Sequence, residues 1–253
     1  MKKEKLKIIY QDKNLLVVDK PSNIIVFSEK SITKKTACGE RSRTMIDLLL
    51  EQFPHLENAG KPLRYGIVHR LDKDTSGVLL VAKNNKTLFY LQKQFKEREV
   101  SKRYIALVTG RLREKEGEIK TLIGRSPKDR IKQKVYFPFE PSSKNKREAV
   151  TNYRVLSVLC SCAKEKKENY YTLVEVITKT GRKHQIRTHF NYLGHPVAGD
   201  KLYGFKNQIS PAGLKRHFLH ASFLEIKFLN GKKREFKSEL PEDLTRVLEN
   251  LNS

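Results

Sequence analysis

The sequence predicts an α+β protein built on a mixed, mostly antiparallel central sheet that is flanked by helices. Apolar runs of strand length recur as neighbours along the chain and are separated by short polar turns. Segments with apolar residues at helical spacing stand between some of these runs, but not after every one. This order favours adjacent hairpins over a doubly wound parallel sheet. The 253 residues, of which 38% are hydrophobic, suffice for one large domain or two small ones, and no linker or repeat divides residues 1–253, so a single domain is expected.

The chain is expected to open with a β-hairpin. Residues 6–10 and 15–19 are apolar, and the polar residues 11–14 between them are typical of a turn. Residues 28–43 follow, and their Ser, Lys, Thr and Arg content predicts a basic loop.

Two helices and one strand are predicted next. Thr44 is a capping residue type that precedes apolar side chains at helical spacing, which indicates a helix start. The Val-rich run at residues 78–81 predicts a buried strand. Asn84 or Asn85 should then cap a second helix.

The middle of the chain predicts three more strands, at residues 104–108, 149–159 and 170–178. A second basic loop is expected at residues 141–149, and the Lys-Glu run at residues 160–169 indicates an exposed hairpin tip.

A short helix, a strand and a last helix complete the prediction. Residues 186–193 have helical spacing, and Gly194 should end that helix. Residues 224–228 alternate and precede Asn230-Gly231, a dipeptide typical of hairpin turns. Residues 241–252 should form a helix that begins at Pro241.

The charge of the chain indicates an anionic polymer as its partner. Lys and Arg total 52 against 28 Asp and Glu, which gives a formal net charge of +24. Such an excess favours a nucleic acid; a merely soluble, Lys-rich surface is the alternative. A membrane is not expected, because no apolar run approaches the roughly 18 residues of a spanning helix and no basic amphipathic helix is present.

The most informative segment is the polar cluster His69-Arg70-Leu71-Asp72-Lys73-Asp74-Thr75-Ser76-Gly77, which precedes the predicted buried strand. Loops that feed core strands often carry functional residues. Asp72 has cations on both sides, at Arg70 and Lys73, and these favour its ionised form. An ionised Asp can act as a nucleophile or a general base. A plain turn or a surface salt bridge is the alternative reading of the same residues.

This segment resembles the His-Arg-Leu-Asp-x-x-Thr-Ser-Gly motif of the RluA-type family of RNA pseudouridine synthases. Further segments resemble that family in the same order, namely residues 102–106, 125–130, 180–189, 194–204 and 219–221. A single short motif would be weak evidence, but the ordered set extends over roughly residues 7–245. The family's fold is a long mixed sheet in two halves with the active cleft across its middle. Many members carry an N-terminal S4 module; because the catalytic resemblance begins near residue 7, no such module is expected here.

The resemblance implies a function and a set of site residues. The family converts uridine in RNA to its C-glycoside isomer, and no cofactor is required for that isomerisation. Asp72 matches the catalytic carboxylate, which could attack the sugar, attack the base or remove a sugar proton. Arg187 matches the arginine that keeps the carboxylate ionised, and Tyr104 matches the tyrosine that faces the flipped base. Arg70 matches a position that can enter the space that the uridine leaves.

Each of these residues also has an ordinary structural reading. Arg187 could be a helix-surface arginine, Tyr104 a strand aromatic in the core, and Arg70 a phosphate contact.

No metal site is expected. His69, His184, His189 and His195 lack the spacing of a metal-binding motif. Cys160-Ser161-Cys162 has no second cysteine pair, so a structural role is favoured for it over metal or redox chemistry.

The leading hypothesis is therefore an isomerase that acts on uridines of structured RNA, with large-subunit ribosomal RNA as the expected substrate and transfer RNA as the alternative. A non-catalytic RNA-binding protein would explain the charge but not the Asp72 motif. A methyltransferase would need a Gly-rich cofactor loop, which is not evident in the sequence. An odd number of cysteines and the absence of a signal peptide favour the cytoplasm, and a monomer is expected.

Overall fold

The computed structural model describes residues 6–28, 43–161 and 169–252. The chain divides into two compact units, the first formed by residues 1–100 and 223–239 and the second by residues 101–222 and 240–253. The predicted loop at residues 28–43 and the tip at 160–169, with Cys162, lie almost entirely outside the described residues. The prediction of a single domain is not tested by this division and stays a prediction.

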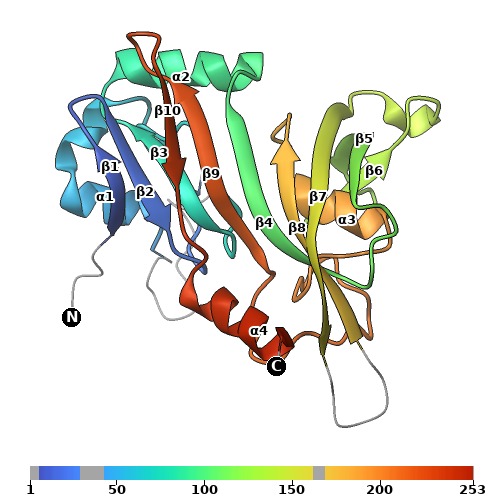
Figure 1. Cartoon of the computed structure of the whole chain (residues 1–253). Helices are drawn as coiled ribbons and strands as arrows, with labels where there is room; N and C mark the ends of the chain where they lie inside the picture. The colour runs from blue at the N-terminus through green and yellow to red at the C-terminus, as the bar shows by residue number, and fades with distance from the viewer. Residues whose placement is uncertain (1–5, 29–42, 162–168, 253) are drawn as a thin grey trace, which may run out of the picture. The chain divides into compact units, whose positions relative to one another are not determined.

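The first unit is a sheet with a helix on each face (Figure 1). Its strand order is β1-β2-β3-β9, and β10 pairs with β9. The elements are β1 (Lys7–Gln11), β2 (Leu15–Lys20), α1 (Met45–Gln52), the 3-10 helix η1 (Pro54–Asn58), β3 (Ser76–Ala82), α2 (Asn85–Glu97), the second part of β9 (Leu219–Lys227) and β10 (Lys233–Lys237).

Strands β2 and β3 are buried on both faces, and this explains their continuous apolar runs. Leu16 and Leu79 pack on the core cluster that includes α1, whereas Val17 and Leu80 pack on the cluster that includes Leu91 of α2. Successive strand side chains point to opposite faces, so each run supplies two cores at once.

Local capping explains where both helices begin. Thr44 Oγ1 accepts a hydrogen bond from Asp47 N, and the Asp47 carboxylate accepts one from Thr44 N. The side-chain oxygen of Asn84 accepts a hydrogen bond from Thr87 N, so Asn84 and not Asn85 is the N-cap of α2. These bonds satisfy backbone donors that have no partner within the helix.

The second unit repeats the same arrangement with other elements. Its strand order is β9-β4-β8-β7-β5-β6. The elements are β4 (Ser101–Thr109), β5 (Glu116–Arg125), β6 (Gln133–Tyr136), η2 (Pro141–Ser143), β7 (Arg147–Ser161), β8 (Asn169–Thr178), α3 (Gln185–Tyr192), the first part of β9 and α4 (Glu242–Asn252). Phe190 of α3 packs in the same core cluster as Ala106 and Val108, and Leu244 of α4 packs in the same cluster as Leu107. Helices α3 and α4 therefore cover opposite faces.

The predicted fold class is confirmed, because the strand pairs β1–β2, β2–β3, β4–β8, β5–β7 and β7–β8 are antiparallel and helices flank the sheet. Strands β5 and β6 were missed, and β10 was implied only by the turn signal at Asn230-Gly231. β5 alternates charged and apolar residues weakly, and β6 has only four residues within a basic segment. The basic loop predicted at 141–149 is shorter than expected, because β7 already begins at Arg147, opposite Ile123 of β5. No helix in the described part of the chain is long and apolar enough to cross a membrane.

Candidate active site

Asp72 lies on a half-buried loop that the backbone holds in a tight turn. Its carbonyl oxygen accepts a hydrogen bond from Thr75 N at 3.2 Å, which closes a turn through Lys73 and Asp74. Thr75 and Ser76 are buried as the chain enters β3. Gly77 has φ of 116°, a conformation that residues with a Cβ rarely adopt. The loop therefore leaves Asp72 half-buried while its neighbours anchor it to the core.

Lys20, at the end of β2, holds this loop in place through hydrogen bonds. Its side chain is fully buried, and Nζ donates to the carbonyl oxygens of Pro21 at 2.7 Å, Ile24 at 2.9 Å and Lys73 at 3.1 Å. Burial of an ammonium group is costly unless hydrogen bonds compensate it, and here three carbonyl oxygens do so. Because Lys73 follows Asp72 directly, Lys20 restrains the position of the candidate catalytic carboxylate.

His69 and Arg70 lie just before Asp72 and contact aromatic rings. The His69 ring stacks on Phe95 with centroids 5.0 Å apart, and His69 Nε2 accepts from Leu80 N at 3.1 Å. Nε2 is therefore occupied as an acceptor and the imidazole is fixed in orientation. Arg70 is exposed, and its guanidinium carbon lies 5.0 Å from the centre of the Phe27 ring.

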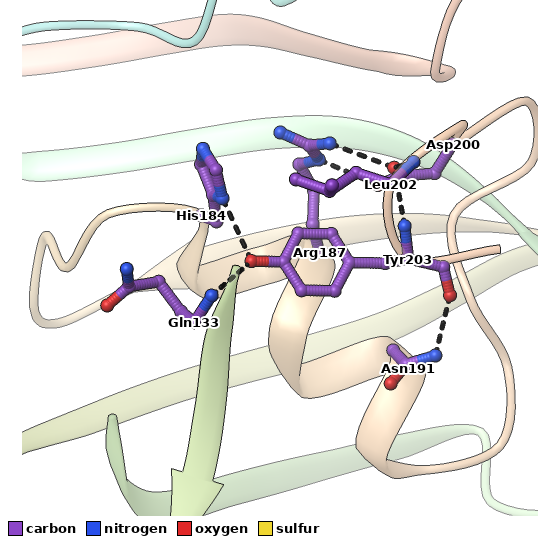
Figure 2. A network of polar contacts seen from close by, with 7 residues as sticks. All are labelled: Gln133, His184, Arg187, Asn191, Asp200, Leu202 and Tyr203. Atoms are coloured by element: carbon purple, nitrogen blue, oxygen red, sulfur yellow. Dashed lines mark hydrogen bonds and ion pairs between the residues drawn. The ribbon is translucent and has the colours of Figure 1, made fainter. Parts of the chain in front are cut away.

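Arg187 is not a helix-surface residue. It is 7% exposed on α3, and its Nε and Nη2 atoms donate to Asp200 Oδ2 at 2.6 Å and Oδ1 at 2.8 Å (Figure 2). This two-point contact matches the planar fork of a guanidinium to a carboxylate. The pair fixes the direction of the Arg187 side chain.

Asp200 is itself held by several donors. Burial alone would raise the pKa of this carboxyl group, but the hydrogen bonds and the charge of Arg187 outweigh burial and place its pKa below the ordinary value. Leu202 N and Tyr203 N also donate to Asp200 Oδ1, at 2.9 and 3.0 Å. Asp200 is thus ionised at neutral pH and can keep Arg187 in place.

Tyr203 connects this pair to β6 and to the N-cap of α3. Its hydroxyl oxygen accepts from Gln133 N of β6 at 2.7 Å and lies 2.9 Å from Nδ1 of His184, the N-cap of α3 (Figure 2). The guanidinium carbon of Arg187 lies 5.1 Å from the centre of the Tyr203 ring. Burial raises the pKa of the Tyr203 hydroxyl, so this group stays protonated.

A second buried network secures the other side of α3. His189 is fully buried, with Nε2 3.0 Å from Thr121 Oγ1 and Nδ1 2.8 Å from Thr151 Oγ1. Burial lowers the pKa of His189 to about 4, so its imidazole is neutral near pH 7. The contacts that the structure describes for His189 therefore give it a structural role.

Tyr104 is half-buried on β4, opposite Val176 of β8. It packs on the core cluster that contains Ile186, the residue before Arg187. Tyr104 and Arg187 thus belong to one unit, whereas Arg70 and Asp72 belong to the other. The pairing of Asp72 with Arg187 that the resemblance implies stays a prediction.

The sequence did not reveal the supporting residues Lys20, Asp200 and Tyr203. Asp200 and Tyr203 fall inside the motif at residues 194–204, and Lys20 is a charge at the end of an apolar run. These signals mark the positions but not their partners. Among the described residues, no three His, Cys, Asp or Glu side chains gather as metal ligands would. The lack of a metal requirement stays a prediction.

Comparison with known proteins agrees with the motifs. The pattern of a family described as "RNA pseudouridylate synthase" matches residues 14–192. The chain is 36% identical to the "Uncharacterized RNA pseudouridine synthase YlyB" of Bacillus subtilis, over 97% of this chain and 73% of the relative. It is also 36% identical to the "Ribosomal large subunit pseudouridine synthase D" of Nitrosomonas europaea, over 96% of this chain and 64% of that relative.

A solved structure supports the fold assignment. "Human RNA Pseudouridylate Synthase Domain Containing 1" superposes with a TM-score of 0.75 at 27% identity, covering 98% of this chain and 89% of that one. The agreement extends over both compact units.

Proposed function

This chain belongs to the RNA pseudouridylate synthase family, and from that premise we propose that it isomerises uridines of large-subunit ribosomal RNA with Asp72 as the catalytic carboxylate. The observation that carries the proposal is the family match over residues 14–192, which includes Asp72, Tyr104 and Arg187. The relative from Nitrosomonas europaea, which is named for the large ribosomal subunit, supports this substrate class.

The reaction would proceed without an added reactant. The N1–C1′ bond of uridine breaks, the base turns over, and C5 bonds to C1′; C5 loses a proton and N1 gains one. Asp72 suits this chemistry because a half-buried carboxylate on a restrained turn can reach a ribose or a base.

The target uridine would have to leave its stack first. Flipping costs a few kcal/mol, which contacts in the pocket must offset. We assign the stacking role to Tyr104, whose core packing leaves it half-buried. Arg187, oriented by Asp200, would supply the positive charge that stabilises the Asp72 carboxylate.

The net charge of +24 is consistent with many contacts between basic side chains and RNA phosphates. We further propose that the two units act as one catalytic domain and that a single copy of the chain carries the complete site.

Mapping of pseudouridines in a strain without the gene tests the proposed function. Carbodiimide adducts on pseudouridine stop reverse transcription, and at least one such stop in large-subunit ribosomal RNA should vanish and return with the wild-type gene. If stops were lost in transfer RNA alone, transfer RNA would take the place of large-subunit ribosomal RNA as the substrate. An unchanged map in all RNA would contradict the activity on native RNA.

A further inference from the structure

Three aromatic rings lie together at the surface of the second unit, where the chain leaves β6. Phe139 is 83% exposed, and its ring stacks on that of Phe137 with centroids 5.5 Å apart and an interplanar angle of 8°. Phe137 also contacts Tyr192 at the end of α3, edge to face, with centroids 5.7 Å apart. Single exposed apolar residues are ordinary, but a contiguous group of exposed rings is a candidate interaction surface. We call these three residues the ring patch.

The backbone around Phe139 is held in a series of turns. The Glu140 carboxylate accepts a hydrogen bond from Phe137 N at 3.1 Å, and Glu140 N donates to the Phe137 carbonyl oxygen at 3.0 Å. Ser143 N then donates to the Glu140 carbonyl oxygen at 2.9 Å. Phe139 lies inside these turns, so its backbone is ordered before a partner arrives and less conformational entropy is lost on binding.

The segment around the ring patch is strongly basic. Residues 125–148, all of which the structure describes, contain eight Lys and Arg against three Asp and Glu. The ammonium groups of Lys134 and Lys146 lie 5.2 and 4.9 Å from the centre of the Tyr136 ring. These two like charges are thus at most about 10 Å apart, and an anion near both would relieve their repulsion. Tyr136 directly precedes Phe137, so the charges and the rings are adjacent.

Rings beside cations favour an RNA strand over a protein as the partner. A single strand offers flat bases that stack on exposed aromatic side chains and phosphates that attract Lys and Arg. A second copy of this chain would carry the same net charge of +24 and would be repelled. The charge therefore selects RNA as the occupant.

The ring patch is close to residues that we propose to act on the target uridine. Tyr192 follows Arg187 by five residues on α3, which is about 7.5 Å along the helix axis. Figure 1 shows β6 beside this helix, and the contact between Phe137 and Tyr192 joins the two elements. An RNA strand that contacts Arg187 can therefore extend to the ring patch within one unit.

We propose that this surface binds an unpaired nucleotide of the RNA other than the target uridine. Phe139 stacks on its base, Phe137 and Tyr192 support the stacked ring, and Lys134 contacts a phosphate. Stacking on an aromatic ring tolerates any base, so the surface adds affinity without selecting a sequence. The inference rests on the proposed function for the RNA that is bound in the cell, but its test with model strands does not.

Binding of two model strands of equal charge tests the stacking role of Phe139. The probes are a single-stranded oligocytidine and an abasic strand of the same length, which has the same phosphates without bases. Phe139→Ala should weaken Kd for oligocytidine about tenfold, the loss expected for one stacked base, and should leave Kd for the abasic strand unchanged. Phe139→Trp keeps an aromatic ring and should bind both strands as wild type does.

Phe89→Ala is the matched control. Phe89 is also a large ring, 65% exposed, but it lies on α2 of the first unit. Its loss should leave Kd for both strands unchanged. An equal loss of affinity would show that exposed rings contribute wherever they lie, and would contradict the assignment to Phe139. Because Phe139 is 83% exposed, Phe139→Ala should unfold at the wild-type temperature.

Lys134→Ala gives an independent electrostatic readout. It should reduce the slope of log K against log salt by about 0.7 for both strands, the change for one phosphate contact to a single strand. Phe139→Ala should leave this slope unchanged. Lys96→Ala removes an exposed cation of α2 and should also leave the slope unchanged.

The proposed surface is refuted if Phe139→Ala binds oligocytidine as tightly as wild type. It is also refuted if Phe139→Ala converts a dimer into a monomer without weakening RNA binding, because the ring patch would then join two copies of the chain. Turnover is measured separately, on the mapped RNA at saturating enzyme, and Phe139→Ala should keep the wild-type single-turnover rate. Absence of turnover in the wild type would contradict the proposed function and would not alter the comparison of Kd values.

Discussion

The Asp72 loop and the Arg187 side chain of α3 are held in place by different kinds of contact. Asp72 is half-buried, and the backbone fixes its loop through the Thr75–Asp72 turn and the contact between Lys20 and the Lys73 carbonyl. Arg187 is buried, and another side chain fixes it through the two-point contact with Asp200.

This difference determines how each region responds to substitution. A half-exposed carboxylate on a backbone-held turn can change chemically with little effect on folding. A buried ion pair cannot lose one partner without leaving the other charge uncompensated. Activity and stability should therefore separate at Asp72 and change together at Arg187.

The largest expected effect is that of Asp72→Asn on chemistry. Asn has nearly the same shape but cannot act as a nucleophile or a base, so the single-turnover rate should fall at least about 10³-fold. RNA affinity should stay within about threefold, and the unfolding midpoint should not change. A rate within tenfold of wild type would remove Asp72 from the catalytic role.

Substitution within the buried pair should affect both properties. Arg187→Ala or Asp200→Ala should each lower the free energy of unfolding by about 3–5 kcal/mol, because each leaves one buried charge. Turnover should fall as well, more than RNA affinity does. Urea unfolding and single-turnover rates at saturating enzyme give the two quantities.

The double variant Arg187→Met/Asp200→Leu separates the two roles of the pair. Apolar replacement of both partners should recover much of the lost stability, but turnover should stay low because the cation is absent. Recovery of turnover together with stability would mean that Arg187 acts only in folding.

Acid should destabilise the second unit through His189. The pKa of His189 is about 4 in the folded chain against an ordinary 6.5, so the unfolded chain takes up the proton first as the pH falls. The stability is complete above pH 6.5 and declines as the pH approaches 4, by about 3 kcal/mol in total. His189→Gln, which can still contact Thr121 and Thr151, should flatten this part of the curve of unfolding free energy against pH. Parallel curves for the variant and wild type would contradict the assignment.

Tyr104 should contribute through its ring. Tyr104→Leu should lower the single-turnover rate by about one to two orders of magnitude, in line with the loss of one stacking contact of roughly 1–3 kcal/mol. Tyr104→Phe keeps the ring and should retain most of the rate. Equal losses in both variants would indicate that the hydroxyl group, rather than stacking, is what the reaction needs.

The smallest effect is expected at an exposed cation such as Lys144. Lys144→Ala should leave turnover unchanged and reduce the log–log salt slope of RNA binding by at most about 0.7. If Arg187→Ala behaved in the same way, the distinction between the buried pair and the exposed charges would fail.

Local features of the fold could be predicted from the sequence, whereas long-range partners could not. The caps at Thr44 and Asn84 depend on residues three positions away, and both are confirmed. Lys20 becomes buried only because the carbonyl of Lys73, 53 residues later, reaches its ammonium group. The same limit applies to Arg187. A local pattern cannot distinguish it from a surface arginine, because its partner Asp200 lies on a loop that contacts α3 only in the folded chain.

The central claim is that this chain alone converts uridine to pseudouridine. The most direct test treats the purified chain, in EDTA and without added cofactor, with its mapped RNA and then determines the intact mass and the carbodiimide reactivity of the product. The mass should be unchanged, one carbodiimide-dependent stop should appear at the target uridine, and Asp72→Asn should give none. A gain in mass, or activity that only a specific metal restores, would contradict the account.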